Sequence, residues 1–326
     1  MKHILYLLST FPLAIFAQFD GIVGSEGCKA IYCNDARFVE WASGCQISRG
    51  YLNITNPQNG FVTFGTEQNA TGKATATETT AAVSLGDGGE AILTFQTPIA
   101  NGDGADFAVF ENSFDDVFLE LASVEVSSDG EHYFRFPATS NTQTETQTGA
   151  YGTLDATQIN NLAGKYRIGW GTPFDLSELP DDENLDKNDI RFVKIIDVTG
   201  TIAPEFATRD HNENIINDPY PTPFASGGFD LTGVGVINNH NNVAALKSIE
   251  QPKFSVFTNP TSNELQITNY ESRNEDRIEI YDIFGKKLKN FQLSTANSQP
   301  KINISELPSG VYIVRIENFA VKFLKM

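Results

Sequence analysis

Residues 90–112 read EAILTFQTPIANGDGADFAVFEN, two apolar runs on either side of a turn made of Asn, Gly and Asp. Both runs have the length and residue types of strands, and the residues between them favour a turn. Similar runs recur at 122–128, 133–138, 191–198 and 229–237. We therefore predict an all-β first domain, most simply a two-sheet sandwich.

Three other local signals refine this prediction. The segment SSDGEHY at 127–133 indicates a hairpin, because Asp-Gly supports a tight turn between alternating flanks. The segment LDATQINNLAG at 154–164 predicts a short helix that Gly164 would close. The acidic segment at 175–189 is typical of a connecting loop.

Charge is distributed unevenly over the 326 residues. Residues 18–250 hold 12 Lys and Arg against 33 Asp and Glu, whereas residues 251–326 hold 10 against 8. The acidic part would repel nucleic acid and anionic membranes and would suit divalent cations or neutral ligands. Solubility of an exported protein accounts for most of this acidic excess without any ligand.

The N-terminus predicts export. A basic start, a short apolar run and the small-residue end AIFA indicate a signal peptide at 1–17, cleaved after Ala17. No later run reaches the roughly 18 apolar residues of a membrane-spanning helix, so none is expected in the mature chain. Cys28, Cys33 and Cys45 make a disulfide plausible, although three is an odd count and the spacing does not select a pair.

A polar stretch at 238–253 separates two domains. We expect a β-sandwich domain at 18–247, a linker at 248–253 and a compact unit at 254–326. The last unit has a turn every 8–12 residues, which is the spacing of a small Ig-like sandwich.

The C-terminal unit carries several motifs in a fixed order: FTNPTSNELQI at 257–267, IEIYDIFGKKL at 278–288, INISELPSGVYIVRI at 302–316 and a closing Lys-bearing strand. It resembles the type A C-terminal sorting domain of the type IX secretion system. The resemblance implies an address label that the secretion machinery reads, and a secreted or cell-surface protein. The residues that carry the motif are Asn259, Pro260, Gly285, Pro308, Gly310 and Lys325. We also expect the last strand to present Lys325 at an edge open to strand addition.

Residues about 80–238 resemble a family of exported bacterial surface proteins of unknown biochemical function. The resemblance rests on the blocks at 83–114, 118–138, 152–179, 193–202 and 216–237. Some relatives look like proteins encoded beside outer-membrane cobalamin receptors, which implies corrinoid capture as one alternative. The strand and turn style also looks like galactose-binding-like jelly rolls, so the sandwich is expected to be jelly-roll-like.

An oxygen-rich loop offers a candidate calcium site. Ca²⁺ takes 6–8 oxygen ligands, and glycines let backbone carbonyls turn inward. The spacing is not that of an EF-hand, and a plain polar turn explains the loop equally well. The predicted structural Ca²⁺ ligands are Asn101, Asp103, Asp106, Glu111 and Asp230.

A long loop at 209–230 is the candidate ligand site, because such loops at sandwich ends often bind ligands. Aromatic rings there offer stacking faces for a sugar or a flat macrocycle, although each ring can equally seal the sandwich edge. The predicted ligand-binding residues are Trp170, Tyr220, Phe224, Asp210 and His211.

No catalytic residue stands out, because the chain has no nucleophile elbow, zinc helix or phosphate loop. We predict a non-catalytic, Ca²⁺-stabilised, carbohydrate-type binding protein at the cell surface. The alternatives are corrinoid capture, a structural or adhesion role, and a glycoside hydrolase-like enzyme. A binder should expose a concave aromatic patch, a scaffold should have flat polar faces, and an enzyme should hold carboxylates of raised pKa in a cleft.

Overall fold

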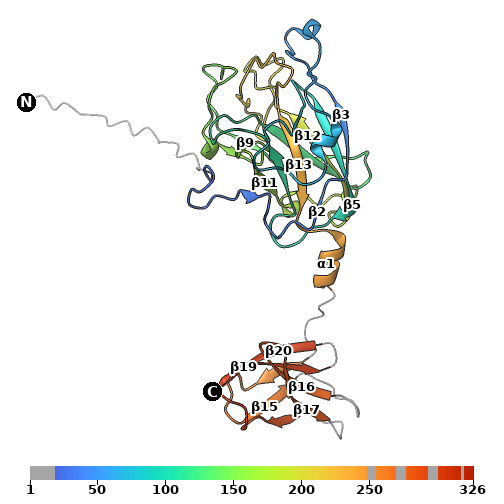
Figure 1. The fold of residues 1–326 in the computed structure, drawn as a ribbon, viewed down its shortest axis with the longest axis vertical. Coiled ribbons are helices and arrows are strands. Elements are labelled where there is room, and N and C mark those ends of the chain that lie inside the picture. The colour runs from blue at the N-terminus through green and yellow to red at the C-terminus, as the bar shows by residue number, and fades with distance from the viewer. Residues whose placement is uncertain (1–18, 248–253, 269–276, 293–299, 317–318) are drawn as a thin grey trace, which may run out of the picture. The chain divides into compact units, whose positions relative to one another are not determined.

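The computed structural model describes residues 19–247, 254–268, 277–292, 300–316 and 319–326 (Figure 1). The chain divides into two compact units between Val243 and Ala244. The expected signal peptide at 1–17 and linker at 248–253 lie outside the described residues.

Two antiparallel sheets form the first unit. One sheet has the order β1 (Ile31–Tyr32), β11 (Trp170–Phe174), β6 (Phe107–Glu111), β13 (Asp230–Val236) and β2 (Glu40–Trp41), and β4 (Val83–Ser84) also pairs with β13. The other has the order β3 (Gly44–Ser48), β5 (Glu90–Ile99), β12 (Ile190–Asp197), β7 (Ala122–Ser127) and β8 (Phe134–Arg135).

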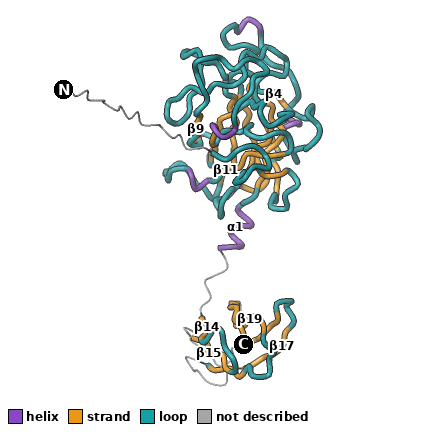
Figure 2. The backbone as a smooth tube through the Cα atoms, turned by 90° about the vertical axis from the view of Figure 1, so that its left-hand side faces the viewer, coloured by secondary structure: helices purple, strands orange, loops and turns teal. Residues whose placement is uncertain are grey.

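Short elements and long loops complete this unit (Figure 2). A two-stranded ribbon pairs β9 (Thr139–Ser140) with β10 (Ile159–Asn160). The 3₁₀ turns are η1 (Pro57–Asn59), η2 (Glu67–Ala70), η3 (Ala156–Gln158) and η4 (Leu176–Glu178). The helix α1 spans His240–Lys247, so the division between the two units falls within it. Among the described residues, no helix has the length and apolar character needed to cross a membrane.

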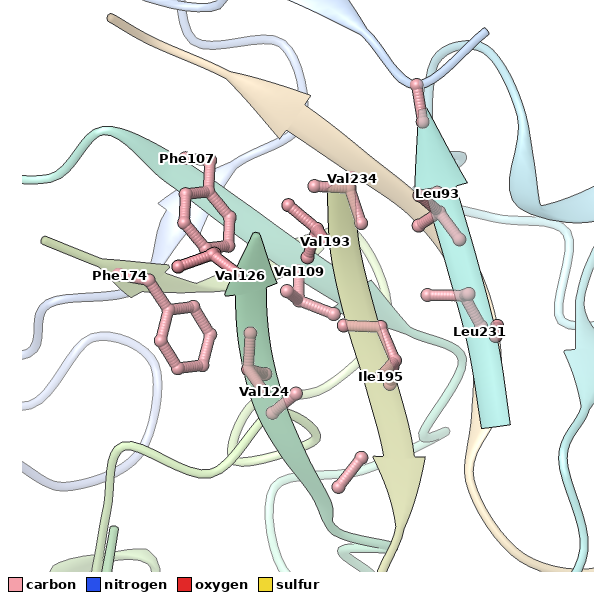
Figure 3. Close-up of a cluster of buried hydrophobic side chains, with 14 of the residues drawn as sticks. Leu93, Phe107, Val109, Val124, Val126, Phe174, Val193, Ile195, Leu231 and Val234 are labelled. Atoms are coloured by element: carbon pink, nitrogen blue, oxygen red, sulfur yellow. The ribbon is translucent and has the colours of Figure 1, made fainter. Parts of the chain in front are cut away.

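The core lies between the two sheets (Figure 3). Alternate residues of β5, β7 and β12 point inward, and Val193 lies beside Leu93 on one neighbour and Val126 on the other. These side chains pack against residues of β6 and β13, including Val109 and Leu231. Burial of each such side chain contributes roughly 1.5–3 kcal/mol, so this interface is the main source of the unit's stability.

Strands β6 and β13 are buried on both faces. A second apolar cluster, which includes Ile31, Phe110 and Ile237, covers the outer face of their sheet. Two-sided burial explains why the sequence of β6 is a continuous apolar run instead of an alternating one.

The all-β prediction is confirmed, as is the hairpin at Asp129-Gly130, which joins β7 to β8. The helix expected at 154–164 is wrong. Asp155 caps a single 3₁₀ turn by accepting a hydrogen bond from the Thr157 amide, and the chain then pairs with β9 as β10. Burial of Ile159 in an apolar cluster overrides the local helix signal. All three cysteines are free thiols.

The second unit is also a two-sheet sandwich, as expected. One sheet has the order β14 (Ser255–Phe257), β15 (Glu264–Thr268) and β18 (Lys301–Asn303). The other has the order β17 (Lys287–Gln292), β16 (Arg277–Asp282), β19 (Gly310–Ile316) and β20 (Phe319–Lys325). Their inner faces share a separate core that includes Ile267, Ile280 and Val314.

Candidate functional site: an aromatic-rimmed acidic pocket

A cavity of about 460 Å³ lies where loops of the first unit meet. Most of its lining belongs to the segment after β6, the segment around Tyr151 and the segment before β13, and the segment between β3 and β4 adds Phe64 and Thr79. This size is within the range of small-molecule sites. The lining residues are Phe64, Thr79, Asn112, Ser113, Phe114, Phe118, Glu120, Ala150, Tyr151, Thr222, Phe224, Ser226 and Asp230.

A continuous row of aromatic rings forms the rim. Phe114 stacks on Phe118 at 4.9 Å between ring centroids, Phe118 lies 6.4 Å from Tyr151, and Tyr151 lies 5.8 Å from Phe224. Three of these side chains face solvent, with exposed fractions of 64% for Phe114, 74% for Tyr151 and 41% for Phe224. Contiguous exposed rings at the mouth of a cavity mark an interaction site.

Local hydrogen bonds hold the first rim loop in place. The Ser113 hydroxyl shares its single proton between the carbonyl oxygens of Asp115, at 2.9 Å, and Phe118. The Asp115 carboxylate in turn accepts from the Val117 amide at 2.9 Å and the Phe118 amide at 2.6 Å. The rings therefore sit on a turn with a defined backbone, which lowers the entropy that binding would cost.

The second rim loop is tied to a neighbouring segment. The Ala225 carbonyl accepts from the Thr63 amide at 3.0 Å and the Phe64 amide at 2.9 Å. The Gly227 amide closes the turn on the Phe224 carbonyl at 3.0 Å. Phe224 thus projects from a fixed position beside Tyr151.

Carboxylates form the floor. Asp230, the first residue of β13, accepts from the Ser84 hydroxyl and from the Asn112 side-chain amide at 3.0 Å. Glu120 precedes β7 and lines the cavity; among the described residues its carboxylate has no hydrogen bond or ion pair. Behind them, Glu111 accepts from the Ser113 amide through Oε2 at 2.6 Å, and its Oε1 is buried without a described partner.

Burial and mutual repulsion disfavour the charged forms of these acids. Burial, aided by the charges of Asp230 and Glu111, raises the pKa of Glu120 well above its usual value. Burial and the charge of Asp230 raise the pKa of Glu111 well above its usual value. Burial raises the pKa of Asp230 to about 6, against the hydrogen bonds from Ser84 and Asn112.

Two more buried carboxylates extend this cluster away from the pocket. Asp197 accepts from the Phe229 amide at 2.7 Å, and Asp218 accepts from the Leu121 amide at 2.6 Å. Burial raises the pKa of both, and each feels further carboxylates in the cluster. Acceptor groups in the floor and ring faces at the rim suit a ligand with an apolar face and hydrogen-bond donors.

Of the five predicted ligand-binding residues, Phe224 alone lines this pocket. Trp170 packs on Tyr32 at 5.0 Å, and Tyr220 is buried with its hydroxyl donating to the Asn53 side-chain oxygen at 2.8 Å. Trp170 and Tyr220 therefore contribute to packing.

Asp210 and His211 line a separate cavity of about 470 Å³. The Asp210 carboxylate holds its own loop and the neighbouring β9 in place, because it accepts hydrogen bonds from the amides of Asn212 at 2.8 Å and Ser140 at 2.9 Å. The five predicted residues thus do not form one site.

The predicted calcium ligands are split between the two ends of β6. Asp106 precedes the strand and Glu111 ends it, a separation of about 16 Å along an extended chain. Asp106 accepts from the amides of Gly102 and Leu176, both at 2.8 Å, and from the Asn238 side chain at 3.0 Å. The prediction that all five residues share one ion is therefore corrected.

The other predicted calcium ligands also differ in their surroundings. Asp103 is exposed, and the Oδ1 atom of Asn101 is buried without a described partner. Asp230 lines the pocket, and Glu111 lies behind it. Among the described residues, no group of three or more His, Cys, Asp or Glu side chains is arranged to hold a metal ion. Calcium binding stays a prediction, and the residues present do not fit it as a set.

Sequence reasoning missed Phe114, Phe118, Glu120 and Tyr151. One signal was available, because Glu120 is the sole charged residue in the run VFLELASV at 117–124. A charge within such a run needs a partner or a function. The rings carried no comparable signal, since they lie in loops without periodicity.

The C-terminal unit indicates how the chain is exported. Residues 255–325 match the family described as "Secretion system C-terminal sorting domain" (Por_Secre_tail). This chain is a cargo of type IX secretion. The cargo is exported to the cell surface or the extracellular space, and its partner in export is the type IX machinery.

Other comparisons add little about this cargo. No curated protein matches it. PorZ, an essential surface component of the type IX secretion system of Porphyromonas gingivalis, is 14% identical over 29% of this chain and 14% of that chain, with a TM-score of 0.19. Lactobacillus rhamnosus β-glucuronidase is 9% identical over 87% of this chain and 43% of that chain, with a TM-score of 0.21. The cargo spans less than half of either protein, and likeness at these TM-scores supports no argument about fold or activity.

In the sorting domain, the end of the chain is tied to the Asn-Pro turn. The Asn259 side chain accepts from the Leu324 amide at 2.9 Å, and the Met326 amide donates to the Thr261 carbonyl at 2.8 Å. Lys325 is buried, and its ammonium donates to the Met326 carbonyl at 2.8 Å. β20 is the edge strand of its sheet, but residues 259–261 cover its last residues, so Lys325 itself does not lie at an open edge.

The remaining motif residues shape turns and strand starts. Gly285 has a φ of 80° in the turn between β16 and β17. The Pro308 carbonyl accepts from the Tyr312 hydroxyl at 2.8 Å, and Gly310 begins β19 opposite Lys325.

Proposed function

We propose that this exported cargo is a non-catalytic carbohydrate-binding protein and that the aromatic-rimmed acidic pocket is its binding site. The observation that carries the proposal is the row of exposed rings Phe114, Tyr151 and Phe224 above two floor carboxylates. Sugar rings present apolar C–H faces that stack on aromatics and hydroxyl groups that donate to carboxylate oxygens.

Three features support binding over a purely structural role. The rings lie at a concave site and not on a flat polar face. The loops that carry them are fixed by hydrogen bonds, as at Ser113 and Asp115. Export places the pocket outside the cell, where glycans are abundant surface ligands.

Glycoside hydrolysis is a second candidate, and one observation favours it. The two floor carboxylates differ, since the pKa of Asp230 is raised to about 6 and that of Glu120 is raised well above its usual value. Asp230 would be mostly ionised above pH 6, whereas the raised pKa of Glu120 favours its protonated form, and glycosidases pair an ionised with a protonated carboxyl group. We rank binding first because Asp230 already accepts hydrogen bonds from Ser84 and Asn112, which hold it as a positioned acceptor.

The test is a glycan array probed with the purified secreted protein, followed by calorimetric titration of any hit. Replacing Tyr151 by Ala should weaken binding roughly 2- to 13-fold, because an aromatic contact is worth about 0.5–1.5 kcal/mol. The matched control is Phe61→Ala, which removes another exposed ring that stacks on Tyr51 outside the pocket. Equal losses in both variants would count against the pocket.

The same titration addresses the alternatives. Release of reducing sugar from a bound glycan, abolished by Glu120→Gln, would move the assignment to hydrolysis. Cyanocobalamin in place of the glycan tests corrinoid capture. Repeating the titration in EDTA and in calcium tests whether calcium contributes to the site.

A further inference from the structure

The charge of the pocket is one-sided. Two carboxylates, Glu120 and Asp230, belong to its lining, and no Lys, Arg or His side chain does. Glu120 is 7% exposed, lines the cavity and has no hydrogen bond or ion pair among the described residues. A carboxylate in this setting normally has a cationic or hydrogen-bonding partner.

The groups around Glu120 increase this imbalance. The charges that act on it most strongly are those of Asp230 on β13, Glu111 on β6, Asp218 in a loop and Asp197 on β12, and all four are acidic. Glu111 adds a fully buried Oε1 atom without a described partner.

Arg49 is the cation that acts electrostatically on Asp230, but its guanidinium is already hydrogen-bonded to backbone carbonyls. Its guanidinium donates to the carbonyl oxygens of Phe64 at 2.8 Å and Gly65 at 2.7 Å, and also to that of Ser84. It forms no ion pair within 4 Å with a carboxylate of the described residues. Among the described residues, neither floor carboxylate therefore has a cation in an ion pair with it.

The rim would also favour a cation. Aromatic faces attract ammonium groups through the ring quadrupole, more strongly where water is partly excluded. Phe114, Phe118, Tyr151 and Phe224 surround the mouth of the cavity, above the carboxylates. A ligand that carries a positive charge next to an apolar ring face would satisfy both features at once.

We propose that the pocket selects an amino sugar, whose protonated amine lies at Glu120 while the sugar ring stacks on the aromatic rim. The inference rests on the proposed carbohydrate-binding function and names the class of sugar. An ammonium group supplies the donors and the charge that Glu120 and Asp230 lack, whereas a neutral sugar supplies donors alone.

Proton linkage follows from this placement. Burial and neighbouring acids hold the pKa of Glu120 well above its usual value, which favours the protonated carboxyl in the free pocket, whereas a bound ammonium would favour release of that proton. Affinity should rise with pH as the floor carboxylates ionise, and fall again as the amine of the ligand loses its own proton. A neutral sugar would lack the falling limb.

Three tetrasaccharides with the same β-1,4-linked backbone make a matched ligand set: cellotetraose with hydroxyl groups at C2, the chitin tetramer with acetamido groups, and the chitosan tetramer with amines. Titration of the secreted protein should give at least about tenfold tighter binding of the chitosan tetramer, or ~1.4 kcal/mol. Titrations in buffers of different ionisation enthalpy should show proton release for that ligand.

The decisive variant is Glu120→Gln, which keeps the shape of the side chain and removes its charge. The affinity ratio of chitosan to cellotetraose should fall toward one, and proton release should disappear. Glu183→Gln, which removes an exposed carboxylate in a distant loop, should keep the ratio. Thermal unfolding of both variants confirms that they fold.

The outcomes separate the two levels of the proposal. If cellotetraose or the chitin tetramer binds as tightly as the chitosan tetramer, the amino-sugar inference is overturned and the carbohydrate function stands. If none of the three binds and the glycan array is also blank, the carbohydrate function itself fails. If Glu120→Gln keeps the full preference, Glu120 is not the group that recognises the amine.

Discussion

Replacement of Asp230 by Asn should change how the stability of the first unit depends on pH. Burial raises the pKa of Asp230 from 3.8 to about 6. Between these values the folded chain holds a proton that the unfolded chain releases, so unfolding becomes easier as pH rises from about 4 toward 7. A difference of about two pKa units corresponds to about 3 kcal/mol of stability, which is present at pH 4 and lost above pH 7.

The Asn variant has no charge to bury, and its hydrogen bonds can be kept. The amide oxygen can accept from Asn112, and the amide nitrogen can donate to the Ser84 hydroxyl, which then acts as an acceptor. We expect the variant to match the wild type near pH 4 and to exceed it by about 1–3 kcal/mol at pH 8.

The assay is urea unfolding of the secreted protein in EDTA at pH 4, 6 and 8, followed by tryptophan fluorescence. Trp41 and Trp170 both lie in the first unit, so the signal reports that unit alone. Glu183→Gln serves as the control for loss of an exposed carboxylate and should shift stability little at any pH. A difference between Asp230→Asn and wild type that stays constant from pH 4 to 8, or a variant that is less stable at pH 8, would refute the reasoning.

Three further predictions concern other parts of the chain. Lys165→Ala should destabilise the first unit by about 3 kcal/mol in urea unfolding, because the largely buried Asp20 carboxylate loses the cation that lies 2.8 Å from it and keeps only the Lys29 amide and the Tyr166 hydroxyl as donors. The double variant with Asp20→Asn should recover part of the loss. Gly164→Ala should lower the free energy of unfolding by at least about 2 kcal/mol and weaken ligand binding, since Gly164 has a φ of 83° and a Cβ there would lie 1.9 Å from the Glu120 carbonyl oxygen. Unfolding and ligand titrations that match the wild type would argue against this close contact. Asn259→Ala removes the acceptor for the Leu324 amide and should lower the fraction of cargo in the culture medium on immunoblots, whereas exposed Ser262→Ala should not.

The sequence by itself determined the β architecture and the destination of the chain. Apolar residues at every second position of β5, β7 and β12 can face one core only as strands, and the C-terminal motifs lie close together in the chain. The helix expected at 154–164 failed because its local signal was weaker than the burial of Ile159, which no local pattern reports.

Tertiary structure alone decided the binding site. Phe114, Tyr151 and Phe224 come from three separate loops, and their rings meet only because the sandwich brings those loops to one place. The predicted calcium set failed for the converse reason, since Asp106 and Glu111 are near in sequence but lie at opposite ends of a strand. An extended strand separates neighbours by about 3.3 Å per residue, while folding joins residues a hundred positions apart, so proximity in sequence is a poor guide to a site built from loops.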